Sequence, residues 1–80
     1  DESGYGRYDL AMIPIKSNEK AYLMEFKISK TKKGMEDSAE KALKQIDEKK
    51  YDTKLRARGI KNILKIGIAF YGKEVKVVFK

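Results

Sequence analysis

Apolar and polar residues alternate in two segments at the start of the chain. The alternation predicts a strand from Arg7 to Ile15 and a second strand from Ala21 to Ile28. The polar stretch Lys16–Lys20 connects them, and so short a connection makes the pair antiparallel. On each strand the large apolar residues share one face, which we expect to form the core: Tyr8, Leu10 and Met12 on the first, and Tyr22, Met24, Phe26 and Ile28 on the second.

A helical pattern follows a basic loop at Ser29–Gly34. From about Met35 to Tyr51 the apolar residues recur at helical spacing and fall into one stripe at 100° per residue. Acidic residues occupy the first turn and lysines the last, which suits the helix dipole. The stripe consists of Met35, Ala39, Ala42, Leu43 and Ile46.

Two further strands are predicted in the last third of the chain. Asn62–Phe70 and Glu74–Phe79 alternate, with a turn at Gly72, and the basic segment Asp52–Lys61 is expected to be a connection. The order β-β-α-β-β predicts an α/β (α+β) fold, with one helix packed on a mixed sheet and a right-handed parallel crossover around the helix. The expected core faces of these strands are Leu64, Ile66, Ile68 and Phe70, and Val75, Val77 and Phe79.

The composition excludes several kinds of functional site. The 80 residues include no cysteine and no histidine, which excludes disulfides, thiolate nucleophiles, Ser-His triads and imidazole ligands. A metal ion would need oxygen ligands, which favours magnesium, manganese or calcium. The longest uncharged apolar run, Ile66–Tyr71, is far shorter than the roughly 18 residues of a membrane span. We therefore expect residues 1–80 to be a single soluble, cytoplasmic domain that does not enter a membrane.

The positive charge is concentrated near the end of the chain. Residues 1–52 carry 11 basic and 11 acidic side chains, whereas residues 53–80 carry eight basic side chains against Glu74, so the net +7 lies in the last 28 residues. A second cluster comprises Lys27, Lys30, Lys32 and Lys33. Such clusters attract polyanions, nucleic acid above all. A lysine-rich solvated surface explains the same pattern.

Two carboxylates and a lysine converge in the predicted sheet. Glu25 and Lys27 are two residues apart and share a strand face, and Asp9 lies on the matching face of the neighbouring strand. Paired carboxylates can hold a divalent cation, and a nearby lysine can orient the attacking water. Gln45 lies about 80° from the centre of the helix stripe, on a border row that the helix could direct at this site. The alternative is an ordinary solvent-facing pair on the strand and a solvated helix flank.

Four segments in this order resemble the PD-(D/E)XK nuclease superfamily, most closely a bacterial branch often found behind an AAA-ATPase-like domain. They are SGYGRYDL (Ser3–Leu10), EFK (Glu25–Lys27), ALKQIDEKKY (Ala42–Tyr51) and IGIAFYGKEV (Ile66–Val75). The resemblance implies a restriction-endonuclease-like fold and Mg²⁺-dependent hydrolysis of DNA, with Mn²⁺ as a substitute.

The same resemblance implies roles for individual residues. Asp9, Glu25 and the backbone carbonyl of Phe26 match the metal ligands of the superfamily, and Lys27 matches its catalytic lysine. Gln45 and Tyr51 match a helix motif, Q-x(5)-Y, whose glutamine lies beside the active site. Arg7 matches an arginine that makes either a phosphate contact or a structural pair. The candidate nucleic-acid contacts are Arg7, Lys30, Lys32, Lys33, Lys49 and Tyr51.

The chain departs from the superfamily pattern in two ways. Tyr8 stands where a proline usually precedes the first aspartate, and the helix and strand that normally come before the Asp9 strand are lacking. We therefore expect the domain to be either a fragment of a larger protein or a minimal version. A bare sheet edge and an uncovered face would predict a homodimer or higher oligomer that completes the sheet.

Two other functions compete with the nuclease. One is a nucleic-acid-binding module with little or no catalysis, and the other is a protein-interaction domain that uses the open sheet edge. DNA versus RNA, and endonuclease versus exonuclease, stay open.

Overall fold

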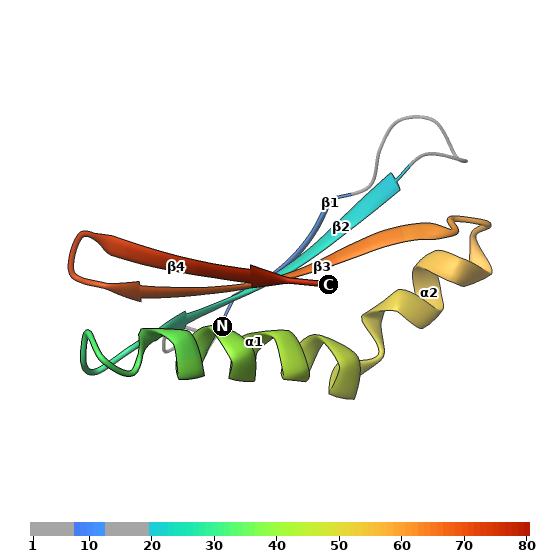
Figure 1. Ribbon diagram of the computed structural model, residues 1–80. Helices are drawn as coiled ribbons and strands as arrows, with labels where there is room; N and C mark the ends of the chain where they lie inside the picture. The colour runs from blue at the N-terminus through green and yellow to red at the C-terminus, as the bar shows by residue number, and fades with distance from the viewer. Residues whose placement is uncertain (1–7, 13–19) are drawn as a thin grey trace.

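The computed structural model describes residues 20–80 and the backbone of residues 8–12. It confirms the predicted mixed sheet and the main helix, and it adds a short second helix (Figure 1). The predicted loop at residues 2–6 and most of the predicted turn at residues 16–20 lie outside the described residues. The elements are β1 (Tyr8–Met12), β2 (Lys20–Ile28), α1 (Met35–Lys49), α2 (Tyr51–Ala57), β3 (Asn62–Tyr71) and β4 (Glu74–Phe79).

The four strands form one sheet in the order β1-β2-β3-β4. β1 is antiparallel to β2, β2 is parallel to β3, and β3 is antiparallel to β4, so the predicted hairpin and parallel crossover are both confirmed. Both helices lie on one side of this sheet, and α1 runs beneath β2, β3 and β4 (Figure 1).

The segment 52–61, which was expected to be a connection, is largely helical, because α2 occupies Tyr51–Ala57. α1 ends at Lys49 because Lys50 adopts a left-handed conformation, with φ of 55°. At the other end of α2, the N–H groups of Gly59 and Ile60 donate to the carbonyls of Arg56 and Leu55, at 2.9 and 3.1 Å. These two bonds form a Schellman motif, in which Gly59 supplies the positive φ of 92°. Leu55 and Ile60 are both buried in the core, so α2 is anchored by apolar contacts rather than by its own polar sequence.

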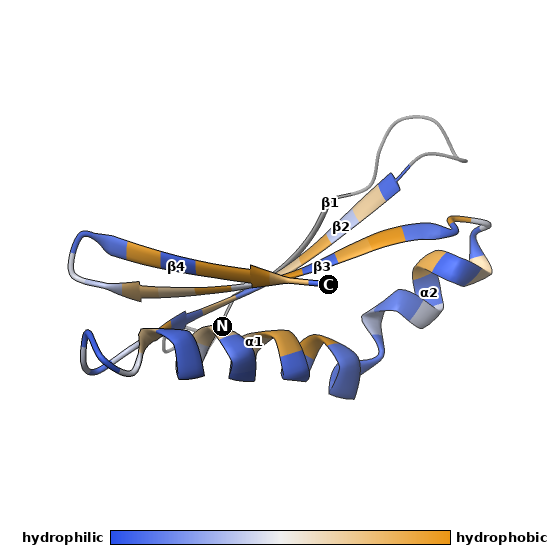
Figure 2. Ribbon diagram, viewed as in Figure 1, coloured by the Kyte–Doolittle hydropathy of each residue, from blue (hydrophilic) through white to orange (hydrophobic). Residues whose placement is uncertain are grey.

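α1 uses the predicted apolar stripe to pack on the sheet. Its buried residues are the five expected from helical spacing. Figure 2 shows the apolar side of α1 turned to the sheet and the hydrophilic side turned away.

The predicted core face of the sheet is wrong. The face beneath α1 carries Leu23 together with small and charged residues. Ala21, Leu23 and Glu25 of β2 and Gly67 and Ala69 of β3 are all buried there. The large apolar residues lie on the opposite face, where Ile28 is 69% and Phe79 68% exposed. The physical reason is close approach, because the helix backbone can lie directly on Gly67 and Ala69 but not on a row of isoleucines and phenylalanines.

Candidate active site

The strand register brings the two predicted carboxylate positions together. Asp9 of β1 pairs directly with Glu25 of β2, and Glu25 pairs on its other side with Gly67 of β3. Directly opposite residues share a face, so Asp9, Glu25 and Gly67 form one row across the sheet on the side covered by α1. Lys27 is half-buried two residues further along the same face.

Glu25 is fully buried, with 0% of its surface exposed. It therefore lies between the sheet and α1 and not on a solvated strand face. Burying a carboxylate costs free energy unless cations or hydrogen-bond donors surround it. Glutamate is therefore rarely fully buried without such a partner.

Gly67 explains how the helix can approach this row so closely. A Cβ atom at residue 67 would meet the carbonyl oxygen of Ala39, and it would lie 2.7 Å from the backbone nitrogen of Leu43. The middle of α1 thus rests on the strand position next to Glu25. Only a glycine leaves space for a helix backbone at this distance.

A lysine from the end of α1 reaches the buried carboxylate. Lys49 Nζ lies 3.6 Å from Glu25 Oε2, and the Lys49 side chain is 29% exposed. Its ammonium also lies 5.8 Å from the centre of the Tyr51 ring, and Tyr51 is half-buried against the core. The structure thus places Lys49, expected on a nucleic-acid surface, beside Glu25 instead. The sequence signal for this contact was the four-residue spacing from Gln45, which puts the two side chains on one border of the helix.

Gln45 lies one turn before Lys49 on that border of α1. Its Oε1 atom is buried and accepts no hydrogen bond from the described residues. An unsatisfied buried amide oxygen costs free energy, so a ligand, ion or water at this point would be stabilised. Lys49 lies on the same border of α1 as Gln45 and reaches Glu25 of β2. The buried Oε1 atom of Gln45 therefore lies on the side of α1 that covers Glu25.

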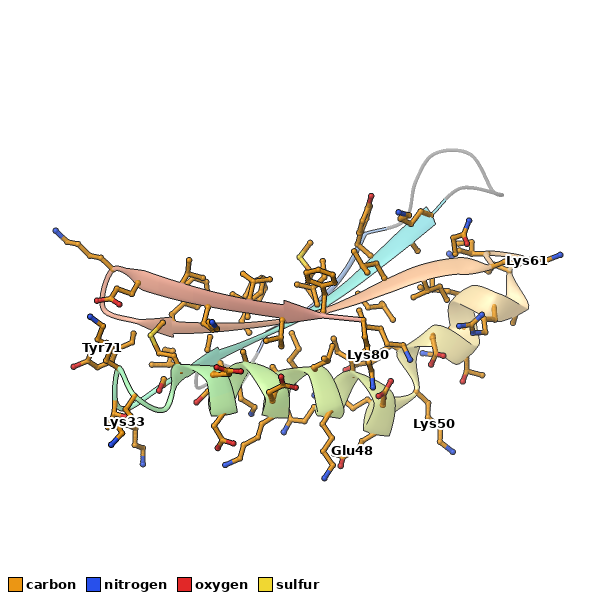
Figure 3. The ribbon with its side chains drawn as sticks, in the orientation of Figure 1. Lys33, Glu48, Lys50, Lys61, Tyr71 and Lys80 are labelled. Carbon is orange, nitrogen blue, oxygen red and sulfur yellow. The ribbon has the colours of Figure 1, made fainter. Side chains whose placement is uncertain are left out.

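The opposite border of α1 carries an ion network that the sequence did not reveal. Asp47 accepts a hydrogen bond from Lys65 Nζ at 2.6 Å and is paired with Lys80 Nζ at 2.7 Å. The hydrogen bonds from Lys65 and then Lys80 hold the pKa of Asp47 below its ordinary value. Asp52 of α2 lies 3.7 Å from the same Lys65 Nζ, so Lys65 of β3 is paired with both helices. Figure 3 shows Lys80 directed from the end of β4 toward the end of α1, as a structural tie would require.

The other predicted site residues lie away from Glu25 or outside the described part. Lys30, Lys32 and Lys33 are exposed in the loop before α1, where Lys32 pairs with Glu74 at 3.5 Å. Phe26 turns its ring to the open face and stacks on Phe70, with centroids 5.9 Å apart, so only its backbone can contribute to the site. Arg7 and the side chain of Asp9 lie outside the described residues.

Comparison with known proteins is consistent with this arrangement. The family model of the PD-(D/E)XK nuclease superfamily matches residues 1–80. The chain belongs to this superfamily. Neither the curated proteins nor the solved structures give a match.

Membership of the PD-(D/E)XK nuclease superfamily agrees with the mixed sheet. The acidic positions that resemble the superfamily motif, Asp9 and Glu25, are the ones that pair in the strand register. Within residues 20–80, no three acidic side chains gather into a ready-made metal cluster. No helix in the described part of the chain is long and apolar enough to span a membrane.

Proposed function

We propose that this chain is a metal-dependent nuclease that hydrolyses phosphodiester bonds in DNA. The observation that carries the proposal is the fully buried carboxylate of Glu25, directly opposite Asp9 in the strand register and beside Lys27 on the same face. Membership of a nuclease superfamily supports the same chemistry.

The residues at this point fit a hard divalent cation. Carboxylate, amide and carbonyl oxygens are the ligands that Mg²⁺ and Mn²⁺ prefer, and the buried Oε1 of Gln45 is an oxygen without a donor among the described residues. Asp9, Glu25 and the carbonyl of Phe26 would hold the ion. When bound, the ion polarises the phosphoryl oxygen and lowers the pKa of a bound water.

The neighbouring side chains have separate tasks in this proposal. Lys27 orients the attacking water and offsets the negative charge that develops on the phosphate. Gln45 positions a water or the metal ligands through its buried amide oxygen. Lys49 lies beside the buried carboxylate of Glu25 and offsets its negative charge.

DNA is the proposed substrate because the exposed charge is strongly positive. Lys30, Lys32 and Lys33 lie in the loop before α1, and Lys50 and Lys61 flank α2 (Figure 3). Arg7 and Tyr51 are further candidate contacts. Phosphate contacts of this kind fix position without reading sequence, so binding should weaken steeply as salt is raised. We also propose that the chain self-associates.

The Lys49–Glu25 ion pair supports a second candidate function. A cation that already neutralises Glu25 competes with a metal for the same carboxylate, and the chain would then bind DNA without cutting it. This binding module predicts salt-dependent affinity that survives the loss of Lys27.

A cleavage assay distinguishes the two functions. The purified chain is incubated with supercoiled plasmid and with single-stranded DNA in Mg²⁺, Mn²⁺ or EDTA. Lys27→Ala is compared with Lys44→Ala, which removes an exposed lysine from the outer side of α1. We expect cleavage that needs metal, falls at least about a hundredfold in Lys27→Ala and is unchanged in Lys44→Ala.

Cleavage that continues in EDTA or in Lys27→Ala would contradict the nuclease mechanism. Binding without cleavage in every variant would favour the binding module. Calorimetry adds a test that is independent of activity, because Asp9→Ala should abolish the binding of Mn²⁺ if Asp9 is a ligand.

A further inference from the structure

Lys49 and Glu25 form an ion pair across the contact between α1 and β2. Lys49 is the last residue of α1, and its Nζ atom lies 3.6 Å from Glu25 Oε2. The glutamate is fully buried, whereas the lysine side chain is 29% exposed. The pair therefore joins a carboxylate without exposed surface to a cation whose side chain reaches the solvent.

This pair is looser than the two pairs that Asp47 makes on the opposite border of α1. The Nζ atoms of Lys65 and Lys80 lie 2.6 and 2.7 Å from the Asp47 oxygens, which are hydrogen-bond distances between charged groups. The 3.6 Å between Lys49 and Glu25 Oε2 is too long for a hydrogen bond to that oxygen. The attraction between Lys49 and Glu25 is therefore mainly coulombic, and another cation can replace it.

The ring of Tyr51 offers the same ammonium a second contact. The ring centroid lies 5.8 Å from Lys49 Nζ, and Tyr51 is half-buried against the core. The face of an aromatic ring attracts an ammonium group through its quadrupole. The lysine stem is flexible, so the ammonium can withdraw from Glu25 while it stays near the ring or turns to the solvent.

We infer that Lys49 is a displaceable cation, which neutralises Glu25 in the empty site and withdraws when a divalent ion binds there. Because this role rests on the proposed metal-dependent function, it assigns the regulation of that site to a residue outside the ligand set. Two cations beside one buried carboxylate repel each other strongly, since little water screens them. Lys49 therefore stabilises the empty site and raises the concentration of metal that the chain needs.

Calorimetric titration with Mn²⁺ in the absence of DNA measures this competition. Lys49→Met removes the charge and keeps a long side chain, and Lys44→Met removes the same charge from the exposed outer side of α1. We expect Lys49→Met to bind Mn²⁺ about tenfold more tightly than the original chain, and Lys44→Met to change the affinity by less than about twofold. Lys49→Arg keeps the cation and should not tighten binding.

Thermal unfolding shows whether Lys49 still contacts Glu25 in the metal-loaded protein. Lys49→Met should lower the melting temperature in EDTA, and its difference from the original chain should shrink in saturating Mn²⁺. Asp47→Asn is the control, because it weakens the pairs on the opposite border of α1 and should lose the same stability in both conditions.

The outcomes separate this role of Lys49 from the nuclease activity. Equal or weaker Mn²⁺ binding in Lys49→Met, tighter binding in Lys49→Arg, or a stability loss that Mn²⁺ leaves unchanged would overturn it. An original chain that binds no Mn²⁺ would overturn it as well, in favour of a lysine that stays in place. Tighter Mn²⁺ binding by Lys49→Met without DNA cleavage by any variant would refute the nuclease and support the displaceable cation.

Discussion

Replacing Gly67 by alanine adds one methyl group at the closest contact between the helix and the sheet. The new Cβ would meet the Ala39 carbonyl oxygen, and it would lie 2.7 Å from the Leu43 nitrogen and 3.1 Å from the Leu43 Cβ, whereas ordinary contacts begin near 3.4 Å. The first two of these atoms belong to the backbone of α1. A change of side-chain rotamer cannot relieve the contact, so the helix itself must move.

The expected cost follows from what the helix carries. A displacement of roughly 1 Å opens gaps beneath the five buried side chains of α1, and overpacking of this kind costs about 1–3 kcal/mol. We expect the upper end, about 3 kcal/mol, because the contact is with backbone. A domain of this length has a total stability of about 4–12 kcal/mol, so the change removes a large part of it. With a urea dependence of about 1–1.5 kcal/mol/M, the unfolding midpoint should fall by roughly 2–3 M.

Urea unfolding followed by far-ultraviolet circular dichroism measures this shift. Val77→Ile is the matched control, since it also adds one methyl group to the sheet but places it on the open, half-exposed face. Its free energy of unfolding should change by less than about 0.5 kcal/mol. If Gly67→Ala and Val77→Ile shift the midpoint equally, α1 does not rest on Gly67, and the placement of Glu25 beneath the helix is refuted.

Three further predictions test other contacts. Asp47→Asn should lower the free energy of unfolding by about 0.5–1 kcal/mol at pH 7. Because pairing lowers the pKa of Asp47, the stability difference between the two proteins should persist above pH 3.8 and vanish as the pH falls through the lowered pKa. Thermal unfolding at several pH values measures this difference. Leu55→Ala should cost about 2–4 kcal/mol in urea unfolding by opening a cavity under α2, while Thr53→Ala on the exposed side stays within about 0.5 kcal/mol. Lys49→Met should lower the melting temperature by removing the cation beside Glu25, and added Mn²⁺ should restore part of it; no loss on mutation would show that the pair contributes nothing.

The local elements of this chain follow from patterns of neighbouring residues. Strand alternation and the helical stripe predict β2, α1, β3 and β4 to within a few residues, and the short connection predicts the antiparallel β1–β2 pair. The spacing of Glu25 and Lys27 also places them on one strand face. Such features depend on geometry within a single element or a single hairpin, which the order of residues specifies directly.

The helix α2 shows where local patterns are insufficient. Its sequence is mostly polar and contains one large aliphatic residue, Leu55, so no apolar stripe predicts this helix. The helix forms because Leu55 and Ile60 are buried together in the core and Gly59 closes its end. Gly59 followed by an apolar residue was the one available signal for this helix end.

The sequence by itself thus determined which positions of each strand share a face, but the tertiary structure decided which face the helix covers. Bulk hydrophobicity favoured the row of large apolar residues, whereas the backbone of α1 packs on the row that contains Gly67 and Ala69, where small side chains allow close approach. That choice buries Glu25, brings Lys49 within 3.6 Å of it and leaves the apolar face open. These outcomes depend on how closely two surfaces can approach, which the polar and apolar pattern of one strand does not contain.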